Sequence, residues 1–153
     1  MDRGPVEPGS VLARGTDRGA RARGLPPRIG AGQHERMGRI LGIGGLLFRA
    51  YDPVALAAWY RDVLGLDLDA EGVWQQEAGP TVVAAAARTA PPSGAPDQRL
   101  MLDLRVSDLE GLVARLAAAG AEVAPGIEDM PGVGRFSWVT DPEGSRIELW
   151  EPS

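Results

Sequence analysis

Two carboxylates and two arginines late in the chain have the types and the spacing to support chemistry. Asp103 and Arg105 alternate along one segment, and Arg146 and Glu148 alternate along another. Residues two apart on a β-strand lie on the same face, so each pair would share one surface. A carboxylate there can act as a general acid or base, or can orient a polar ligand by hydrogen bonding.

The composition excludes several other kinds of chemistry. The 153 residues contain no cysteine, which removes disulfides and thiolate chemistry, and one histidine, His34. The net charge of −5 gives no electrostatic footprint for nucleic acid. No apolar run approaches the roughly 18 residues that a membrane span needs. We therefore expect a cytoplasmic protein with no nucleic-acid partner and no membrane partner.

Residues 1–36 are rich in Gly, Pro and Arg and have no hydrophobic periodicity. Such a stretch cannot bury enough surface to fold, so we expect a disordered extension. Two alternatives are an arginine-rich arm that touches nucleic acid and an over-long start, since Met37 directly precedes the first patterned segment. His34 lies in this extension, which leaves residues 37–153 as a domain without histidine.

The domain contains the same order of elements twice, and residues 38–88 form the first copy. Ile40–Ala50 is expected as a strand, although glycines interrupt it and both of its faces are apolar. Asp52 is a good N-cap for a helix that begins at Pro53 and ends at Gly65. The three strands that follow are expected at Leu66–Asp69, Val73–Glu77 and Thr81–Ala87.

The second copy, residues 98–152, follows a breaker-rich linker at residues 89–97. Arg99–Val106 alternates apolar and polar residues, which predicts a strand. Ser107-Asp-Leu-Glu110 has the form of a capping box, and the helix that it begins stops at Gly120. The last three strands are expected at Ala121–Ala124, Gly134–Thr140 and Ser145–Glu151.

This repeat resembles the vicinal oxygen chelate superfamily, which includes glyoxalases, dioxygenases and bleomycin-resistance proteins. The stretches that carry the resemblance are Asp52–Leu66, Arg105–Leu109 and Asp141–Pro152, in the family's order. The resemblance implies an α+β fold in which two tandem βαβββ modules form an open eight-stranded barrel with the helices outside. It also implies a cavity lined by the strand faces that turn away from the helices.

The apolar face of each strand must pack on a helix, so the opposite face is assigned to the cavity. A bulged turn at residues 141–144 would pair Trp138 with Glu148, whereas a two-residue turn would place Ser137 there. We prefer the bulged turn because Gly144 suits the left-handed position. Besides Glu148, the residues expected to bind a ligand are Arg49, Trp74, Met101, Asp103, Arg105, Trp138, Arg146 and Trp150.

The resemblance also indicates where a metal would bind: through a ligand on the first strand of each module and a glutamate on the last strand. Glu148 matches the glutamate, but the other two positions fall at Gly45 and Met101. Glycine has no ligand atom, and a thioether is a poor ligand for Zn, Ni or Fe. We therefore expect no metal cofactor. Asp103 and Glu148 could still offer oxygen to Mg²⁺, Mn²⁺ or Ca²⁺, unless they pair with the arginines on the same faces.

The first functional hypothesis is metal-free binding of a small, aromatic or apolar organic molecule by stacking on tryptophans. The alternative role for each tryptophan is core packing. The second hypothesis is an enzyme, a lyase, isomerase or dioxygenase-like protein, that uses Glu148 as acid or base or as the remaining ligand of an atypical metal site. Glu148 could also be purely structural, and a regulatory domain without small-molecule chemistry is the third hypothesis. The resemblance further implies a homodimer, since two-module members commonly pair and the open barrel leaves strand edges for a partner.

Overall fold

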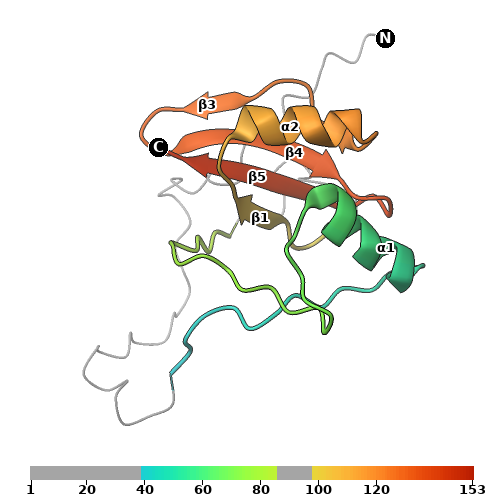
Figure 1. The fold of residues 1–153 in the computed structure, drawn as a ribbon. Helices are drawn as coiled ribbons and strands as arrows, with labels where there is room; N and C mark the ends of the chain where they lie inside the picture. The colour runs from blue at the N-terminus through green and yellow to red at the C-terminus, as the bar shows by residue number, and fades with distance from the viewer. Residues whose placement is uncertain (1–38, 86–97) are drawn as a thin grey trace, which may run out of the picture. The chain divides into compact units, whose positions relative to one another are not determined.

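The computed structural model describes residues 39–85 and 98–153. Residues 39–49 cluster apart from the rest and are described by themselves. The remaining described residues form an α+β fold with an open sheet and helices (Figure 1). No helix in this part of the chain has the length and apolar character that crossing a membrane would require.

The sheet has five strands, and all of them come from the second predicted module. They are β1 (Leu102–Arg105), β2 (Glu122–Val123), β3 (Glu128–Met130), β4 (Gly134–Thr140) and β5 (Arg146–Pro152). The strand order is β1-β5-β4-β2, and β3 also pairs with β4. β1 runs parallel to β5, and the other pairs are antiparallel. β5 and β4 therefore form the centre of the sheet.

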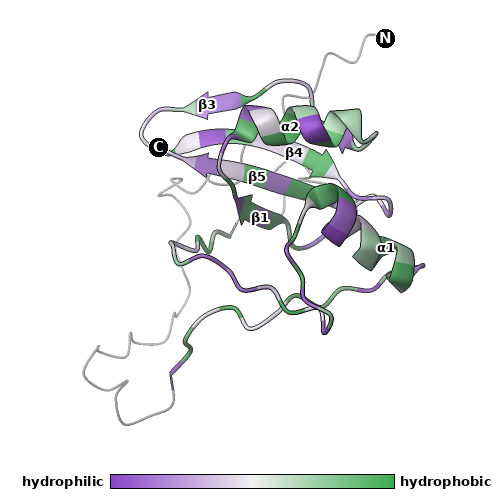
Figure 2. Ribbon diagram, viewed as in Figure 1, coloured by the Kyte–Doolittle hydropathy of each residue, from purple (hydrophilic) through white to green (hydrophobic). Residues whose placement is uncertain are grey.

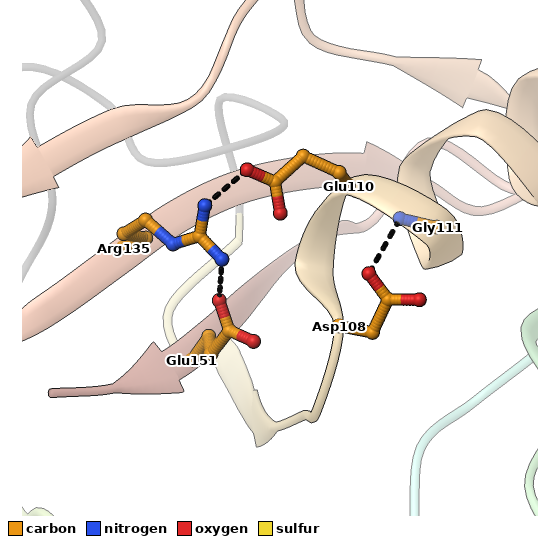
Figure 3. A network of polar contacts seen from close by, with 5 residues as sticks. All are labelled: Asp108, Glu110, Gly111, Arg135 and Glu151. Carbon is orange, nitrogen blue, oxygen red and sulfur yellow. Dashed lines mark hydrogen bonds and ion pairs between the residues drawn. The ribbon is translucent and has the colours of Figure 1, made fainter.

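The helix of the second module, α2 (Leu109–Ala118), begins one residue later than the expected capping box. Its N-cap is Asp108 and not Ser107, because the Asp108 carboxylate accepts a hydrogen bond from the Gly111 N–H at 3.2 Å (Figure 3). Aspartate is as good an N-cap as serine, so its position decides where the helix begins. The predicted end is confirmed: Gly120 follows the helix with φ +80°.

An ion-pair network joins α2 to the sheet beside this cap (Figure 3). The guanidinium of Arg135 on β4 binds Glu110 of α2 with one nitrogen and Glu151 of β5 with another. A backbone hydrogen bond, and then the hydrogen bond from the Arg135 guanidinium, lower the pKa of Glu110. One arginine thus connects three elements at this end of the sheet.

The first predicted helix is confirmed at both ends. The Asp52 carboxylate accepts from the Ala55 N–H at 3.0 Å and caps α1 (Pro53–Trp59). A π-helical turn, η3 (Tyr60–Leu64), continues α1, and Gly65 ends it with φ +90°. A residue with positive φ at this point is the common way to close a helix, and glycine adopts it without strain.

The strands expected in the first module are not formed. Residues 39–50 and 81–85 contain no strand, and Leu68 and Trp74 make only one isolated antiparallel bridge. The eight-stranded barrel is therefore not confirmed, and the sheet is open. Residues 86–87 of the third expected strand, the linker 89–97 and the extension 1–36 lie outside the described residues.

The sequence of the first expected strand explains why its pattern was a weak signal. Gly42, Gly44 and Gly45 have no side chain to pack, and each loses more backbone entropy in a strand than another residue would. Both faces of this segment are apolar, so no alternation selects one register.

The main hydrophobic core lies between the sheet and the helices. The alternation along β5 that creates its apolar face can be followed in Figure 2. Ile147, Leu149 and Val139 face the helices, as the alternation predicts, and α2 contributes Leu109 and Leu116. The rest of this cluster is Leu56, Tyr60, Leu64 and Leu104. Because strand side chains alternate, the opposite face of β4 and β5 is left for other residues.

Candidate functional site

The closing hairpin sets which residues share that opposite face. The Asp141 N–H donates to the Ser145 carbonyl at 2.9 Å, and Gly144 has φ +89°. Trp138 consequently pairs with Glu148 across the two strands. This confirms the bulged turn and rejects the two-residue turn, which would have placed Ser137 beside Glu148.

The Asp141 carboxylate holds the turn rigidly and connects it to the first module. It accepts from the N–H groups of Glu143 and Ser145 at 2.9 and 2.8 Å, and from the Tyr60 hydroxyl at 3.2 Å. Burial, and then the Asp141 carboxylate, raise the pKa of Tyr60 well above its ordinary value, so its hydroxyl remains a neutral donor. No local pattern predicts this contact, because it joins residues 81 positions apart.

Glu148 is the most deeply buried carboxylate at this face, with 1% of its surface exposed. Its Oε2 accepts a hydrogen bond from the indole Nε1 of Trp138 at 2.9 Å. The guanidinium carbon of Arg146 lies 4.8 Å from the centroid of the Trp138 ring, which is a cation–π contact. Burial lowers the pKa of Arg146, and Glu148 and Glu128 partly oppose that shift. Trp138 is thus fixed at its nitrogen and covered on its ring by a poorly solvated cation.

Asp103 lies on the other side of Glu148. β1 and β5 pair in parallel, and Asp103 is the Cα partner of Glu148. Its Oδ1 is buried and makes no hydrogen bond within the described residues. Burial, and then the negative charge of Glu148, raise the pKa of Asp103 to about 7. A carboxyl whose pKa lies near neutral can take up or release a proton at physiological pH.

Arg146 interacts electrostatically with Glu148, but the direct contacts that the two arginines make are with other groups. Arg105 donates to the backbone carbonyls of Glu77 at 2.7 Å and Pro80 at 3.1 Å, and so ties the segment before residue 81 to β1. Arg146 lies over the Trp138 ring. Both arginines are therefore engaged by carbonyl or aromatic groups.

A second hydrophobic cluster closes one end of the face. Trp150 stacks on Phe136 with ring centroids 6.4 Å apart and planes 6° apart. Its indole N–H donates to the Val133 carbonyl at 3.1 Å. Trp138 belongs to the same cluster, and Met101 packs against it. Phe136 was not among the predicted site residues, although it lies two positions before Trp138 on the same alternation.

The structure brings six of the predicted ligand-binding residues to this face together with Glu148: Met101, Asp103, Arg105, Trp138, Arg146 and Trp150. It does not bring Trp74 there. Trp74 packs against the helix-side core, which is the alternative role that its sequence pattern allowed. Arg49 lies in the separately described segment of residues 39–49, so its place at the site stays a prediction.

The donor set at this face does not fit a transition-metal site. Within residues 39–85 and 98–153, no three His, Cys, Asp or Glu side chains come together where they could hold a metal ion. The two carboxylates that do meet, Asp103 and Glu148, have a tryptophan and an arginine as their neighbours. The expectation of a protein without a metal cofactor stays a prediction.

The family model of the glyoxalase-like domain matches residues 45–150 of this chain. No curated protein matches it. Among solved structures, TnmS3, described as an antibiotic binding protein from Streptomyces sp. CB03234, is 25% identical over 67% of this chain and 88% of its own, with a TM-score of 0.43. TioX from Micromonospora sp. ML1 is 24% identical over 67% of this chain and 89% of its own, also with a TM-score of 0.43.

Proposed function

This chain belongs to the family of glyoxalase-like domains in the vicinal oxygen chelate superfamily, and from that premise we propose that it binds a small, flat, aromatic or apolar organic molecule without a metal ion. The observation that carries the proposal is the fixed Trp138 ring beside two carboxyls. A flat apolar surface with few polar groups nearby is the usual composition of a small-molecule site.

Trp138 has the properties of a stacking platform. The hydrogen bond from its Nε1 to Glu148 prevents the indole from rotating, so little side-chain entropy is lost when a ligand stacks on it. Trp138 is 3% exposed and Arg146 covers its ring, so a ligand that stacks on the ring must displace the guanidinium. Burial already disfavours the charged form of Arg146, and moving this long side chain outward restores its hydration.

Replacing Trp138 with alanine should weaken binding of a flat aromatic probe, 8-anilinonaphthalene-1-sulfonate, at least tenfold. An aromatic pair contributes about 0.5–1.5 kcal/mol beyond the area that it buries, and losing that area adds to the effect. Probe fluorescence measures the affinity. Trp74→Phe is the matched control, because Trp74 packs on the helix-side core. If Trp74→Phe weakened binding and Trp138→Ala did not, the ligand would bind elsewhere.

A specific observation also favours a second function, an enzyme that uses Glu148 as acid or base. Asp103 and Glu148 are paired across adjacent strands, and the pKa of Asp103 is raised to about 7. Such a pair can accept and return a proton during a lyase or isomerase reaction.

Glu148→Gln separates these two functions, since glutamine still accepts the hydrogen bond from Trp138 but cannot take up a proton. If the protein only binds its ligand, the variant should keep the affinity of the wild type within about threefold. An isomerase or lyase activity that disappears from the variant while the affinity is kept would contradict the pure binding function. Turnover and dissociation constants measured on the same preparations decide the matter.

The homodimer remains part of this proposal. In the described part of the chain β1 pairs with β5 alone, and an edge strand can accept a partner. A mass of one chain at every concentration in light scattering would contradict it.

A further inference from the structure

Asp103, Glu148 and Trp138 lie in one row across three strands. Glu148 is the pairing partner of Asp103 on one side and of Trp138 on the other. All three side chains point to the face opposite the helices, because paired residues in a sheet share a face. Neighbouring strands are about 4.8 Å apart, so the backbones of Asp103 and Trp138 are separated by about 10 Å. A two-ring molecule stacked on Trp138 can span this distance with one substituent.

The two ends of the row differ in their hydrogen bonding. Trp138 uses its only donor on Glu148. At the other end, the buried Oδ1 of Asp103 is the one side-chain N or O atom in residues 39–85 and 98–153 that combines burial with the lack of a hydrogen-bond partner. A buried oxygen without a partner costs free energy, which is recovered when a donor reaches it. The row therefore contains an aromatic platform and, two strands away, an unused acceptor.

We propose that Asp103 determines the specificity of this site and selects ligands that carry a hydrogen-bond donor, a hydroxyl, amide N–H or ammonium group, at the edge of a flat ring system. The inference rests on the proposed binding function and adds the chemical class of the ligand. Trp138 provides affinity that depends on ring area, and Asp103 discriminates between ring systems of equal area.

This discrimination is expected to be strong in one direction. A site that is built to hydrogen-bond a ligand rejects the analogue that lacks the donor, because the polar group of the protein then stays buried and unpaired. Asp103 acts as a hydrogen-bond acceptor above neutral pH. Burial and Glu148 raise its pKa to about 7, so the carboxyl is ionised at about pH 8 and cannot itself donate.

Two probes of nearly equal ring area test the inference: 2-naphthol, which carries a hydroxyl donor, and 2-methoxynaphthalene, which does not. Tryptophan fluorescence quenching of the full chain at about pH 8 gives both affinities. The wild type should bind 2-naphthol about tenfold more tightly, as expected for one hydrogen bond. Asp103→Leu should remove this preference and leave the affinity for 2-methoxynaphthalene equal or higher. Asp103→Asn, which keeps an acceptor oxygen and the shape of the side chain, should keep part of the preference.

The results distinguish this inference from the proposed function. If both probes bind and Asp103→Leu keeps the wild-type preference for 2-naphthol, the inference is wrong and the binding function stands. The same conclusion follows if the wild type binds the two probes equally. If neither probe binds the wild type, the proposed function and the inference both fail. Thermal unfolding shows whether Asp103→Leu is folded. If it is not, Asp103→Asn takes its place as the variant that does not titrate. At about pH 5 Asp103 of the wild type is protonated, and a wild-type preference for 2-naphthol that is still tenfold there overturns the inference.

Discussion

Gly134→Ala is expected to lower the free energy of unfolding by about 3–5 kcal/mol, from backbone strain together with overpacking. Gly134 has φ +145°, in a region that other residues rarely adopt. A Cβ at this position would lie 2.2 Å from the Glu151 carbonyl oxygen and 2.5 Å from Nε1 of Trp150. Because the first of these atoms belongs to the backbone of the paired strand, it cannot move aside without breaking the ladder between β4 and β5.

Gly132→Ala is the matched control for this prediction. Gly132 also has a positive φ, +76°, but a Cβ there would meet no atom within 4 Å. This variant should lose only about 1 kcal/mol, the cost of the conformation alone. Chemical denaturation of both variants measures the difference. If the free energy of unfolding fell equally in the two variants, the close approach of β5 to Gly134 would not contribute to the destabilisation.

The effect should extend to the candidate site. The glycine lets Trp150 lie against β4 and donate its N–H to the Val133 carbonyl, which fixes one end of the aromatic cluster. At a temperature where Gly134→Ala is still folded, the near-UV circular dichroism of the tryptophans should therefore change, whereas Gly132→Ala should leave it as in the wild type.

The second large effect is a loss of stability as the pH rises from about 4 to 7, caused by Asp103. Its pKa is raised from 3.8 to about 7 in the folded protein, by burial first and by Glu148 second. Between these two values the folded chain holds a proton that the unfolded chain has released, so raising the pH favours unfolding. The contribution is fully present below pH 3.8 and is lost as the pH passes through 7.

Solvent screening limits how much Asp103 changes the free energy of unfolding with pH. A shift of about three units in a fully buried group corresponds to about 4 kcal/mol. The Asp103 side chain is only partly buried, and solvent screening reduces the expected change in the free energy of unfolding to about 2 kcal/mol. Among the charged groups nearby, Glu148 faces Asp103 from β5 and raises its pKa further, whereas Arg105, two residues later on β1, donates to backbone carbonyls.

Asp103→Asn isolates the contribution of Asp103 to the pH dependence of stability, since asparagine has a similar shape and does not titrate. The stability of the variant relative to the wild type should rise by about 2 kcal/mol between pH 4 and 7.5, because only the wild type must ionise a buried group. Urea denaturation at several pH values measures it, and Asp69→Asn, at an exposed position, is the control. A difference between Asp103→Asn and the wild type that does not vary with pH would contradict the prediction.

The second module could be predicted from the sequence in unusual detail, because its signals are local. The alternation of Ile147 and Leu149 with Glu148 identifies the face that is buried against the helices. The Asp-Pro-Glu-Gly turn fixes the hairpin register through the positive φ that Gly144 adopts, and the register alone brings Trp138 to Glu148. Turn chemistry and a two-residue period are properties of a few neighbouring residues, so they are visible without the tertiary structure.

The short strand β3 (Glu128–Met130) was missed for the opposite reason. Two of its three residues are acidic, and it forms because β4 offers a free edge. The only local signal was the pair of Pro-Gly dipeptides, at residues 125–126 and 131–132, that enclose it.

The sequence by itself determined the helix ends at Asp52 and Gly65, the hairpin register and the absence of histidine from the domain. Only the tertiary structure decided that Asp103 has an unpartnered buried oxygen and that Arg146 covers Trp138. The physical reason is that register and capping depend on residues close in the chain. The burial of a carboxyl and the destination of an arginine depend instead on which strands meet, and parallel pairing of β1 with β5 joins segments that no local pattern connects.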